Sequence, residues 1–166
     1  MSDTVTIRPA SLEDVPLVLE FIRDLARYER LEHEVSASEA QLRAALFGDR
    51  RHAEVVFACD DGAPVGFALF FHNFSTFKGQ PGIYLEDLFV RPEARGRGVG
   101  KRLLAYLART AVDRHCARLE WAVLDWNEPS IGFYRSLGAV PMDEWTTFRL
   151  TGDALTLLAG SAPANR

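Results

Sequence analysis

The sequence predicts a single α/β domain in which helices flank one mixed β-sheet. Its 166 residues are 48% hydrophobic and 25% charged, as expected for one globular domain with a full core. Strand and helix patterns follow one another in the order β-α-α-β-β-β-α-β-α-β. A strand, a glycine-rich loop and an amphipathic helix are consecutive in residues 83–106, and this unit carries most of the functional information.

The N-terminal third predicts one strand and two helices. Residues 5–8 begin with three β-branched residues and end before a proline, which indicates a short strand. A helix is expected to start after Ser11, with Asp14 completing a capping box, and to run to about Tyr28. A second, shorter helix is expected over residues 38–48, with the same kind of cap at its start.

The middle of the chain predicts a hairpin followed by a loop. Residues 53–58 and 65–71 have the composition of two strands, and the Asp-Asp-Gly at 60–62 is a tight-turn signal between them. Serine, glycine and proline crowd residues 74–82, which indicates a loop.

The remaining elements alternate between strands and helices. Strands are expected over residues 83–90, 118–124 and 146–150, and helices over 98–113 and 130–136. A single domain is expected to occupy residues 1–160, and the tail 161–166 is expected to be disordered.

Composition excludes several classes of function. The net charge of −4 disfavours nonspecific nucleic-acid binding and favours a cationic substrate. We expect no membrane association and a cytoplasmic location, because no stretch resembles a signal peptide or a membrane span. Cys59 and Cys116 are expected to be buried free thiols, and the scattered histidines predict no metal site.

Three glycines alternate with other residues just before a predicted helix: Gly96, Gly98 and Gly100. Glycine adopts backbone conformations that are closed to other residues, so several N–H groups can turn toward one point. The helix N-terminus adds unpaired N–H groups and the positive end of its dipole. The loop therefore predicts a pyrophosphate site, and four cationic side chains surround it: Arg95, Arg97, Lys101 and Arg102.

Three interpretations of this glycine loop can be tested against its spacing and its context. A P-loop needs glycine, four residues, then Gly-Lys and Ser or Thr, but Arg95 holds the first position and Arg102 follows Lys101. A dinucleotide fingerprint needs a third glycine where Lys101 stands. A glycine turn without a ligand is disfavoured because strand, loop and helix occur in the order that an anion site needs.

The pattern Arg-x-x-Gly-x-Gly, after a strand that ends in Val-Arg-Pro, resembles the acyl-CoA pyrophosphate loop of the GNAT superfamily of N-acetyltransferases. Residues 122–139 resemble the cofactor-side motif of that superfamily, with Asn127 and Tyr134 at its asparagine and tyrosine positions. Alone, Asn127 is equally explained as a helix cap and Tyr134 as a core aromatic. The resemblance implies the GNAT fold, a mixed and mostly antiparallel sheet flanked by helices.

Within the superfamily the chain most resembles the diamine (spermidine/spermine) acetyltransferase branch, and in that branch the thialysine N-ε-acetyltransferases. The segments that carry this resemblance are residues 25–29, 47–48, 75–79, 84–87 and 122–127. Phe77 stands where the branch usually has tryptophan, and residues 73–77 lack the acidic side chain of polyamine-specific members. A lysine-like or thialysine-like amine is therefore favoured over a polyamine.

The resemblance also implies the site residues. Acetyl-CoA, the only cofactor expected, would be bound by two sets of residues: Leu88, Phe89, Val90, Arg95, Gly96, Arg97, Gly98, Val99, Gly100 and Lys101, and then Asn127, Ser130 and Tyr134. The amine substrate would contact Glu29, Glu86 and Asp87. The alternative for Glu29 is a solvated surface patch that includes Glu32 and Glu34.

The reaction implied is direct acetyl transfer to an amine. An alkyl amine of pKa near 10.4 must lose a proton first, at a cost of about 4.6 kcal/mol at neutral pH. Glu86 is the expected base, with binding of the ammonium alone as its alternative. A backbone N–H near Phe89 would polarise the carbonyl, and Tyr134 would protonate the leaving thiolate.

Two other functions stay open at this stage. A protein or peptide acetyltransferase would need an open groove for its substrate, and a noncatalytic acyl-CoA-binding module would not need Glu86 or Tyr134. Because the resembling branch is dimeric, a homodimer is also expected.

Overall fold

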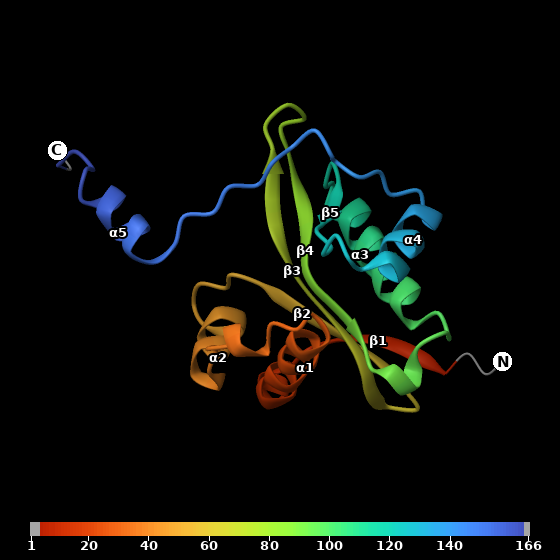
Figure 1. Ribbon diagram of the computed structural model, residues 1–166. Coiled ribbons are helices and arrows are strands. Elements are labelled where there is room, and N and C mark those ends of the chain that lie inside the picture. The colour runs from red at the N-terminus through yellow and green to blue at the C-terminus, as the bar shows by residue number, and fades with distance from the viewer. Residues whose placement is uncertain (1–3, 165–166) are drawn as a thin grey trace. The chain divides into compact units, whose positions relative to one another are not determined.

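The computed structural model describes residues 4–164 and contains one five-stranded sheet with the strand order β1-β2-β3-β4-β5 (Figure 1). Neighbouring strands are antiparallel from β1 to β4, and β5 pairs parallel to β4. The expectation of a mixed, mostly antiparallel sheet flanked by helices is confirmed. The strands are β1 (Val5–Pro9), β2 (Glu54–Asp60), β3 (Ala63–Ser75), β4 (Gln80–Val90) and β5 (Leu119–Trp121).

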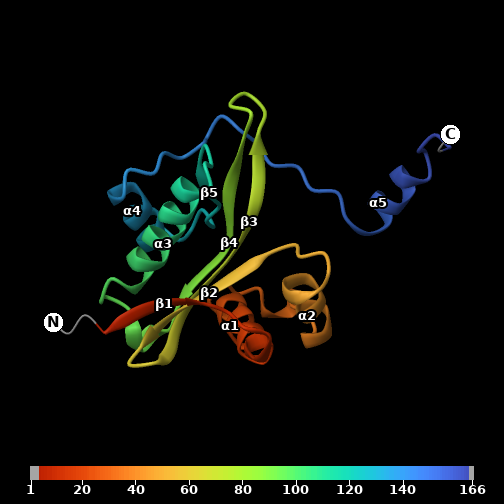
Figure 2. The same cartoon turned by 180° about the vertical axis from the view of Figure 1, so that it is seen from behind.

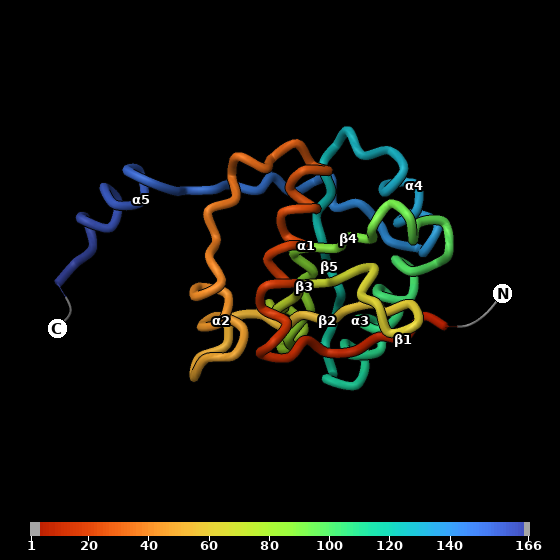
Figure 3. The backbone as a smooth tube through the Cα atoms, turned by 90° about the horizontal axis from the view of Figure 1, so that it is seen from below, coloured from red at the N-terminus to blue at the C-terminus, as the bar shows by residue number. Residues whose placement is uncertain are grey.

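The chain divides into two compact units, residues 1–124 and 125–166, and the whole sheet belongs to the first. The helices of the first unit are η1 (Leu12–Asp14), α1 (Val15–Tyr28), η2 (Glu32–Glu34), α2 (Glu39–Phe47), η3 (Pro92–Ala94) and α3 (Val99–Asp113). α1 and α3 lie on opposite sides of the strands, as the views from behind and from below show (Figures 2 and 3).

The two helix layers follow from strands that are apolar on both faces. In β2, five consecutive residues are buried, so each face of this strand must be covered. Phe57 and Phe67 join a core cluster with Phe21 of α1. On the other face, a side chain at Gly66 would meet Val99 and Leu103 of α3, which explains why glycine occupies that point of β3.

Polar side chains set the helix starts as expected. Ser38 accepts a hydrogen bond from the Gln41 N–H at 3.2 Å, and the Gln41 side chain accepts one from the Ser38 N–H at 2.9 Å. At the first cap, the Asp14 carboxylate accepts from the Ser11 N–H at 2.7 Å and also pairs with Arg8. These pairings hold the pKa of Asp14 at about 2.

Three strand predictions need correction in the first unit. β3 and β4 extend through much of the expected loop at 74–82, so that only a short turn joins them, with Gly79 at φ 63°. Pro81 fits inside β4 because it pairs near the hairpin end, where a missing N–H is tolerated. β5 is limited to three residues rather than 118–124. Cys59 is buried as expected, but Cys116 is only half-buried.

The second unit contains two helices, α4 (Glu128–Ser136) and α5 (Gly152–Ala159). The predicted strand at 146–150 is wrong: these residues form no regular secondary structure and pair with no strand of the described chain. Their β-forming side chains give local preference only, and a strand also needs a partner edge. Trp145 is 77% exposed and Phe148 is 92% exposed. α5 was not predicted, although its leucines suit a helix.

Candidate functional site

A β-bulge in β4 places two consecutive carboxylates on one face of the sheet. Leu69 of β3 pairs with Asp87, whereas Phe70 pairs with Leu85, so Glu86 is an extra residue in β4. Side chains normally alternate between faces, and a one-residue insertion cancels one step of that alternation. Glu86 and Asp87 consequently line the same pocket.

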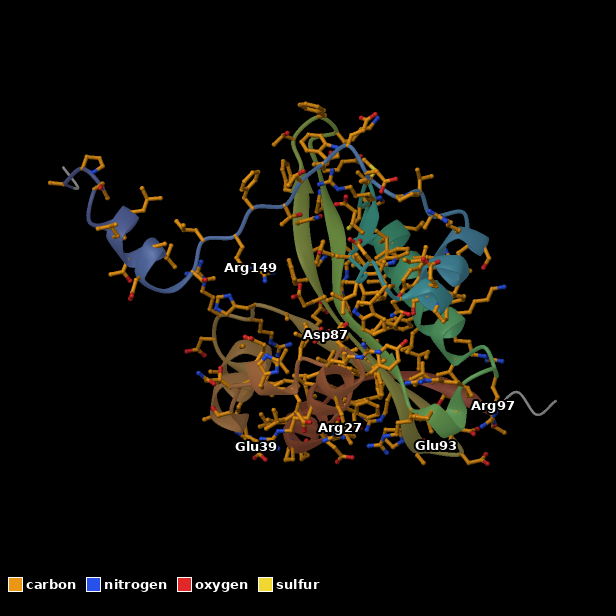
Figure 4. The ribbon with its side chains drawn as sticks, viewed as in Figure 1. Arg27, Glu39, Asp87, Glu93, Arg97 and Arg149 are labelled. Carbon is orange, nitrogen blue, oxygen red and sulfur yellow. The ribbon has the colours of Figure 1, made fainter. Side chains whose placement is uncertain are left out.

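The pocket has a volume of about 410 Å³, which is within the usual range for small-molecule sites. It lies between the C-terminal part of α1, the segment that follows α1, and the bulge of β4. Its acidic lining residues are Glu29, Glu34, Glu86 and Asp87, and its other lining residues are Ile22, Leu25, Ala26, Leu31, Val35, Ser36 and Ala37. Figure 4 labels Asp87 on β4.

Burial and the charge of neighbouring carboxylates raise the pKa of two acidic residues of the pocket, Asp87 and Glu29. Burial, followed by repulsion from Glu86 and Glu29, raises the pKa of Asp87 from 3.8 to about 7. Burial, and then Glu86, also raises the pKa of Glu29. A cation that binds in this pocket would favour the ionised form of these carboxyl groups. The negative charge that results would in turn attract the cation.

The bulge also marks the point where β4 and β5 stop pairing. Their pairing covers Ile83 to Leu85 of β4, although this strand continues to Val90. On the β5 side of Leu88, Phe89 and Val90, the backbone has no ladder partner in the described chain. Such an edge can hydrogen-bond a ligand that lies along it. These are the β4 residues for which the sequence predicts pantetheine contacts.

The glycine loop joins η3 to α3. Gly96 and Gly98 have φ values of 75° and 77°, in the left-handed region that favours glycine, and Gly98 is the N-cap of α3. A Cβ atom at either position would meet no heavy atom within 4 Å. The space over the loop is therefore open at the N-terminus of α3, where N–H groups bind anions. This arrangement fits the pyrophosphate of acetyl-CoA.

Three of the four cations near the loop make contacts within the protein. Arg97 Nη1 lies 2.7 Å from Asp60 Oδ2 (Arg97 is labelled in Figure 4), and Arg102 Nη1 donates to the Val5 carbonyl at 3.3 Å. The Arg95 Nε–H donates to the carbonyl of Val90 at 2.8 Å. The fourth, Lys101, is an exposed side chain in the first turn of α3.

The second unit carries the other predicted cofactor residues. Asn127 is the N-cap of α4, and its Oδ1 accepts a hydrogen bond from the Ser130 N–H at 3.4 Å. The capping role considered for Asn127 is thus confirmed. Its contact with the cofactor stays a prediction. Tyr134 lies on α4 with its ring centre 5.6 Å from that of Phe133.

Two features of the site were not predicted. Glu34 lines the pocket, although it was expected only as part of a solvated surface patch. Its spacing of five residues from Glu29 carries no regular signal. The shared face of Glu86 and Asp87 did have a signal: adjacent acids between buried apolar residues break strand alternation.

Within residues 4–164, no three His, Cys, Asp or Glu side chains form a group that could hold a metal. No described helix is long and apolar enough to cross a membrane.

Comparisons with known proteins agree with this geometry. Residues 18–139 match the family described as the acetyltransferase (GNAT) family. Thialysine N-epsilon-acetyltransferase of Bos taurus is 40% identical, over 94% of this chain and 98% of that protein. L-ornithine N5-acetyltransferase NATA1 of Arabidopsis thaliana is 34% identical, over 90% of this chain and 85% of that protein.

A solved structure shows the same fold. The integron cassette protein VCH_CASS6, from the mobile metagenome of V. cholerae, superposes with a TM-score of 0.79 at 31% identity. The match covers 96% of this chain and 100% of that one. The sequence resemblance to thialysine acetyltransferases and the structural match therefore extend over nearly the same residues.

Proposed function

Since this chain belongs to the GNAT family of N-acetyltransferases, which use acetyl-CoA, we propose that it acetylates the primary amine of a small cationic molecule. The favoured acceptor is a lysine-like or thialysine-like amine, as in the names of the relatives that are 40% and 39% identical. A diamine or polyamine is the nearest alternative.

The acidic pocket is the observation that carries this proposal. Four carboxylates line it, and none of the described residues that line it is basic. An ammonium group would bind there by charge, and Asp87, with a pKa near 7, would be ionised by a bound cation. The volume of about 410 Å³ also suits a small amine.

We assign proton removal to the bulge carboxylates. Glu86 would accept the proton of the substrate ammonium, directly or through a water molecule, while Asp87 and Glu29 hold the cation. The exposed edge of β4 beyond the bulge would supply a backbone N–H near Phe89 to the acetyl carbonyl oxygen as negative charge develops there. Tyr134 would donate its hydroxyl proton to the departing sulfur.

The glycine loop would hold the pyrophosphate of acetyl-CoA. Gly96 and Gly98 leave open space at the N-terminus of α3, and the loop N–H groups and Lys101 supply donors and positive charge. Leu88 to Val90 would bind the pantetheine arm along the stretch of β4 with which β5 does not pair. Asn127 and Ser130, at the start of α4, would contact the same arm.

We further propose that the protein is a homodimer. Large apolar side chains are exposed throughout the end of the second unit: Val140, Met142, Trp145, Phe148, Leu150, Leu155, Leu157 and Leu158. Large exposed apolar side chains in this number are typical of a chain segment that contacts another protein surface. Sedimentation that finds only the 18.6 kDa species at micromolar concentration would contradict the dimer.

The activity is tested by following thiol release from acetyl-CoA with a panel of acceptors. The panel contains thialysine, lysine, an alkyl diamine, spermidine, a lysine-containing peptide and no acceptor. We expect release with small amines and none without an acceptor. Faster release with the peptide would support a protein acetyltransferase, and acetyl-CoA binding without any release would support a noncatalytic module.

A further inference from the structure

Arg95 is held against the protein by three contacts, although it lies in the glycine loop. Its Nε–H donates to the carbonyl of Val90 at 2.8 Å. Its guanidinium carbon lies 5.1 Å from the centre of the Tyr28 ring and 5.3 Å from that of Phe89. Both distances are within the range of a cation–π contact. The planar group therefore rests on two aromatic rings while one edge is tied to the backbone of β4.

The two rings belong to the two elements that carry the pocket carboxylates. Tyr28 is the last residue of α1, and the pocket residue Glu29 follows it as the C-cap. Phe89 lies two residues after Asp87, on the same face of β4. The ring centres of Tyr28 and Phe89 are 6.4 Å apart. Arg95 thus braces the end of α1 against β4 at the point where these elements form the acidic pocket.

We propose that Arg95 is a positioning residue for the amine, acting through Tyr28 and Phe89 on Glu29 and Asp87, rather than a phosphate ligand. This inference rests on the proposed function, because it assumes that the acidic pocket binds the amine.

The side-chain chemistry suits this role. Arginine has a planar guanidinium that stacks on aromatic rings, and its Nε–H points sideways from the stem, so one group makes both kinds of contact. A lysine would keep the charge but has neither the plane nor that N–H. If Arg95 served only as a positive charge for phosphate, lysine would replace it adequately. Arg95→Lys therefore separates the two roles.

The test compares Arg95→Lys and Arg95→Met with two control variants. Lys101→Met removes an exposed cation beside the loop, and Arg109→Met removes an arginine of α3 whose side chain is 74% exposed. Affinity for acetyl-CoA is measured by calorimetry, and KM and kcat by thiol release with the best amine of the panel.

We expect both Arg95 variants to raise the amine KM on the order of tenfold, since small displacements of positioning groups have effects of this size or larger. Their dissociation constants for acetyl-CoA should stay within about twofold of the wild-type value. Lys101→Met should show the opposite pattern, with weaker acetyl-CoA binding and an unchanged amine KM. Arg109→Met should match the wild type. Tyr28→Leu should raise the amine KM as well, and the double variant with Arg95→Met should be no worse than either single variant.

The inference is overturned if Arg95→Lys behaves like the wild type, or if Arg95→Met weakens acetyl-CoA binding and leaves the amine KM unchanged. A measurement that needs no turnover distinguishes failure of this inference from failure of the proposed function. Carboxyl-carbon NMR should show that Arg95→Met lowers the pKa of Glu29 toward its ordinary value, because the end of α1 is released to solvent. An unchanged Glu29 titration also counts against the inference. A wild-type protein that acetylates no amine would refute the proposed function alone.

Discussion

Nη1 of Arg97 lies 2.7 Å from Oδ2 of Asp60, an ion pair that ties the middle of the glycine loop to the end of β2. Thr4 also donates a hydrogen bond to this carboxylate, at 2.6 Å. Together, Thr4 and Arg97 lower the pKa of Asp60. Because its charge is already paired, Arg97 is better suited to fixing the loop than to binding phosphate.

Arg97 and Lys101 should therefore contribute differently to acetyl-CoA binding. Lys101→Met should raise the dissociation constant on the order of tenfold, since a hydrogen bond to a charged group contributes about 1.5–3 kcal/mol. Arg97→Met should raise it by less than about threefold. Calorimetry at low and moderate salt measures both. The reverse order would show that Arg97 leaves Asp60 to bind the cofactor.

Gly98→Val should abolish acetyl-CoA binding. The φ of 77° at Gly98 is strained for a β-branched residue, and its side chain would enter the open space over the loop. Gly79→Val in the β3–β4 turn is the matched control, because Gly79 also has positive φ and open space. Both variants should lose stability in thermal unfolding, and only Gly98→Val should lose binding. Unchanged affinity in Gly98→Val would contradict the pyrophosphate assignment.

The pKa of Asp87 predicts a pH-dependent amine affinity. With a pKa of about 7, Asp87 is protonated below that pH and negatively charged above it, so the KM for a cationic amine should fall as pH rises through 7. Asp87→Asn should raise KM and remove this step. Asp113→Asn, at the exposed end of α3, should leave the profile as it is. A step that survives in Asp87→Asn would have to belong to another group.

The same pKa has a consequence for stability, which serves as a second measurement on Asp87→Asn. A carboxyl group whose pKa is raised by folding binds more protons in the folded than in the unfolded state between pH 3.8 and about 7. The free energy of unfolding contributed by Asp87 therefore falls as pH rises through that window. The Tm of Asp87→Asn relative to the wild type should rise over the same interval.

Glu86→Gln should lower kcat/KM and be partly rescued at high pH, where more of the amine arrives already neutral. Initial rates between pH 7 and 10 measure the effect. Glu93→Gln, on the exposed turn η3, is the control and should follow the wild-type profile. A pH profile that Glu86→Gln does not alter would reduce Glu86 to a substrate contact.

Tyr134→Phe distinguishes an acid from a packing residue, because it removes one hydroxyl group and keeps the ring. If Tyr134 protonates the leaving sulfur, kcat should fall by about 10²-fold or more with little change in acetyl-CoA affinity. Tyr106→Phe on α3 is the control for loss of a tyrosine hydroxyl. Wild-type turnover in Tyr134→Phe would remove that residue from the mechanism.

Local rules accounted for much of the fold. The caps at Ser11 and Ser38, the left-handed glycines before α3 and the apolar stripes of α1 depend on neighbours within a few residues, so the sequence reports them directly. The family signals in the glycine loop predicted the fold class correctly for the same reason. Strand lengths were predicted less well, because pairing across a sheet decides where a strand ends.

The parts that sequence could not supply depend on contacts between distant residues. The β-like stretch at 146–150 has no partner strand in the described chain, and nothing in its own residues reveals this. The contacts of Arg95 with Tyr28 required α1 and the loop to be placed side by side. Its position in a motif associated with phosphate gave no sign of them. The raised pKa of Asp87 likewise depends first on its burial, and then on Glu86 and on Glu29, which is far from it in sequence.

The bulge in β4 makes the pair Glu86 and Asp87 depend on chain length as well as on residue identity. A related protein with the same two acids but one residue fewer in this strand would turn one of them to the opposite face. Counting shared acids in an alignment would then overstate the similarity of two sites. A gap of a single position in β4 is more informative about chemistry than several substitutions around it.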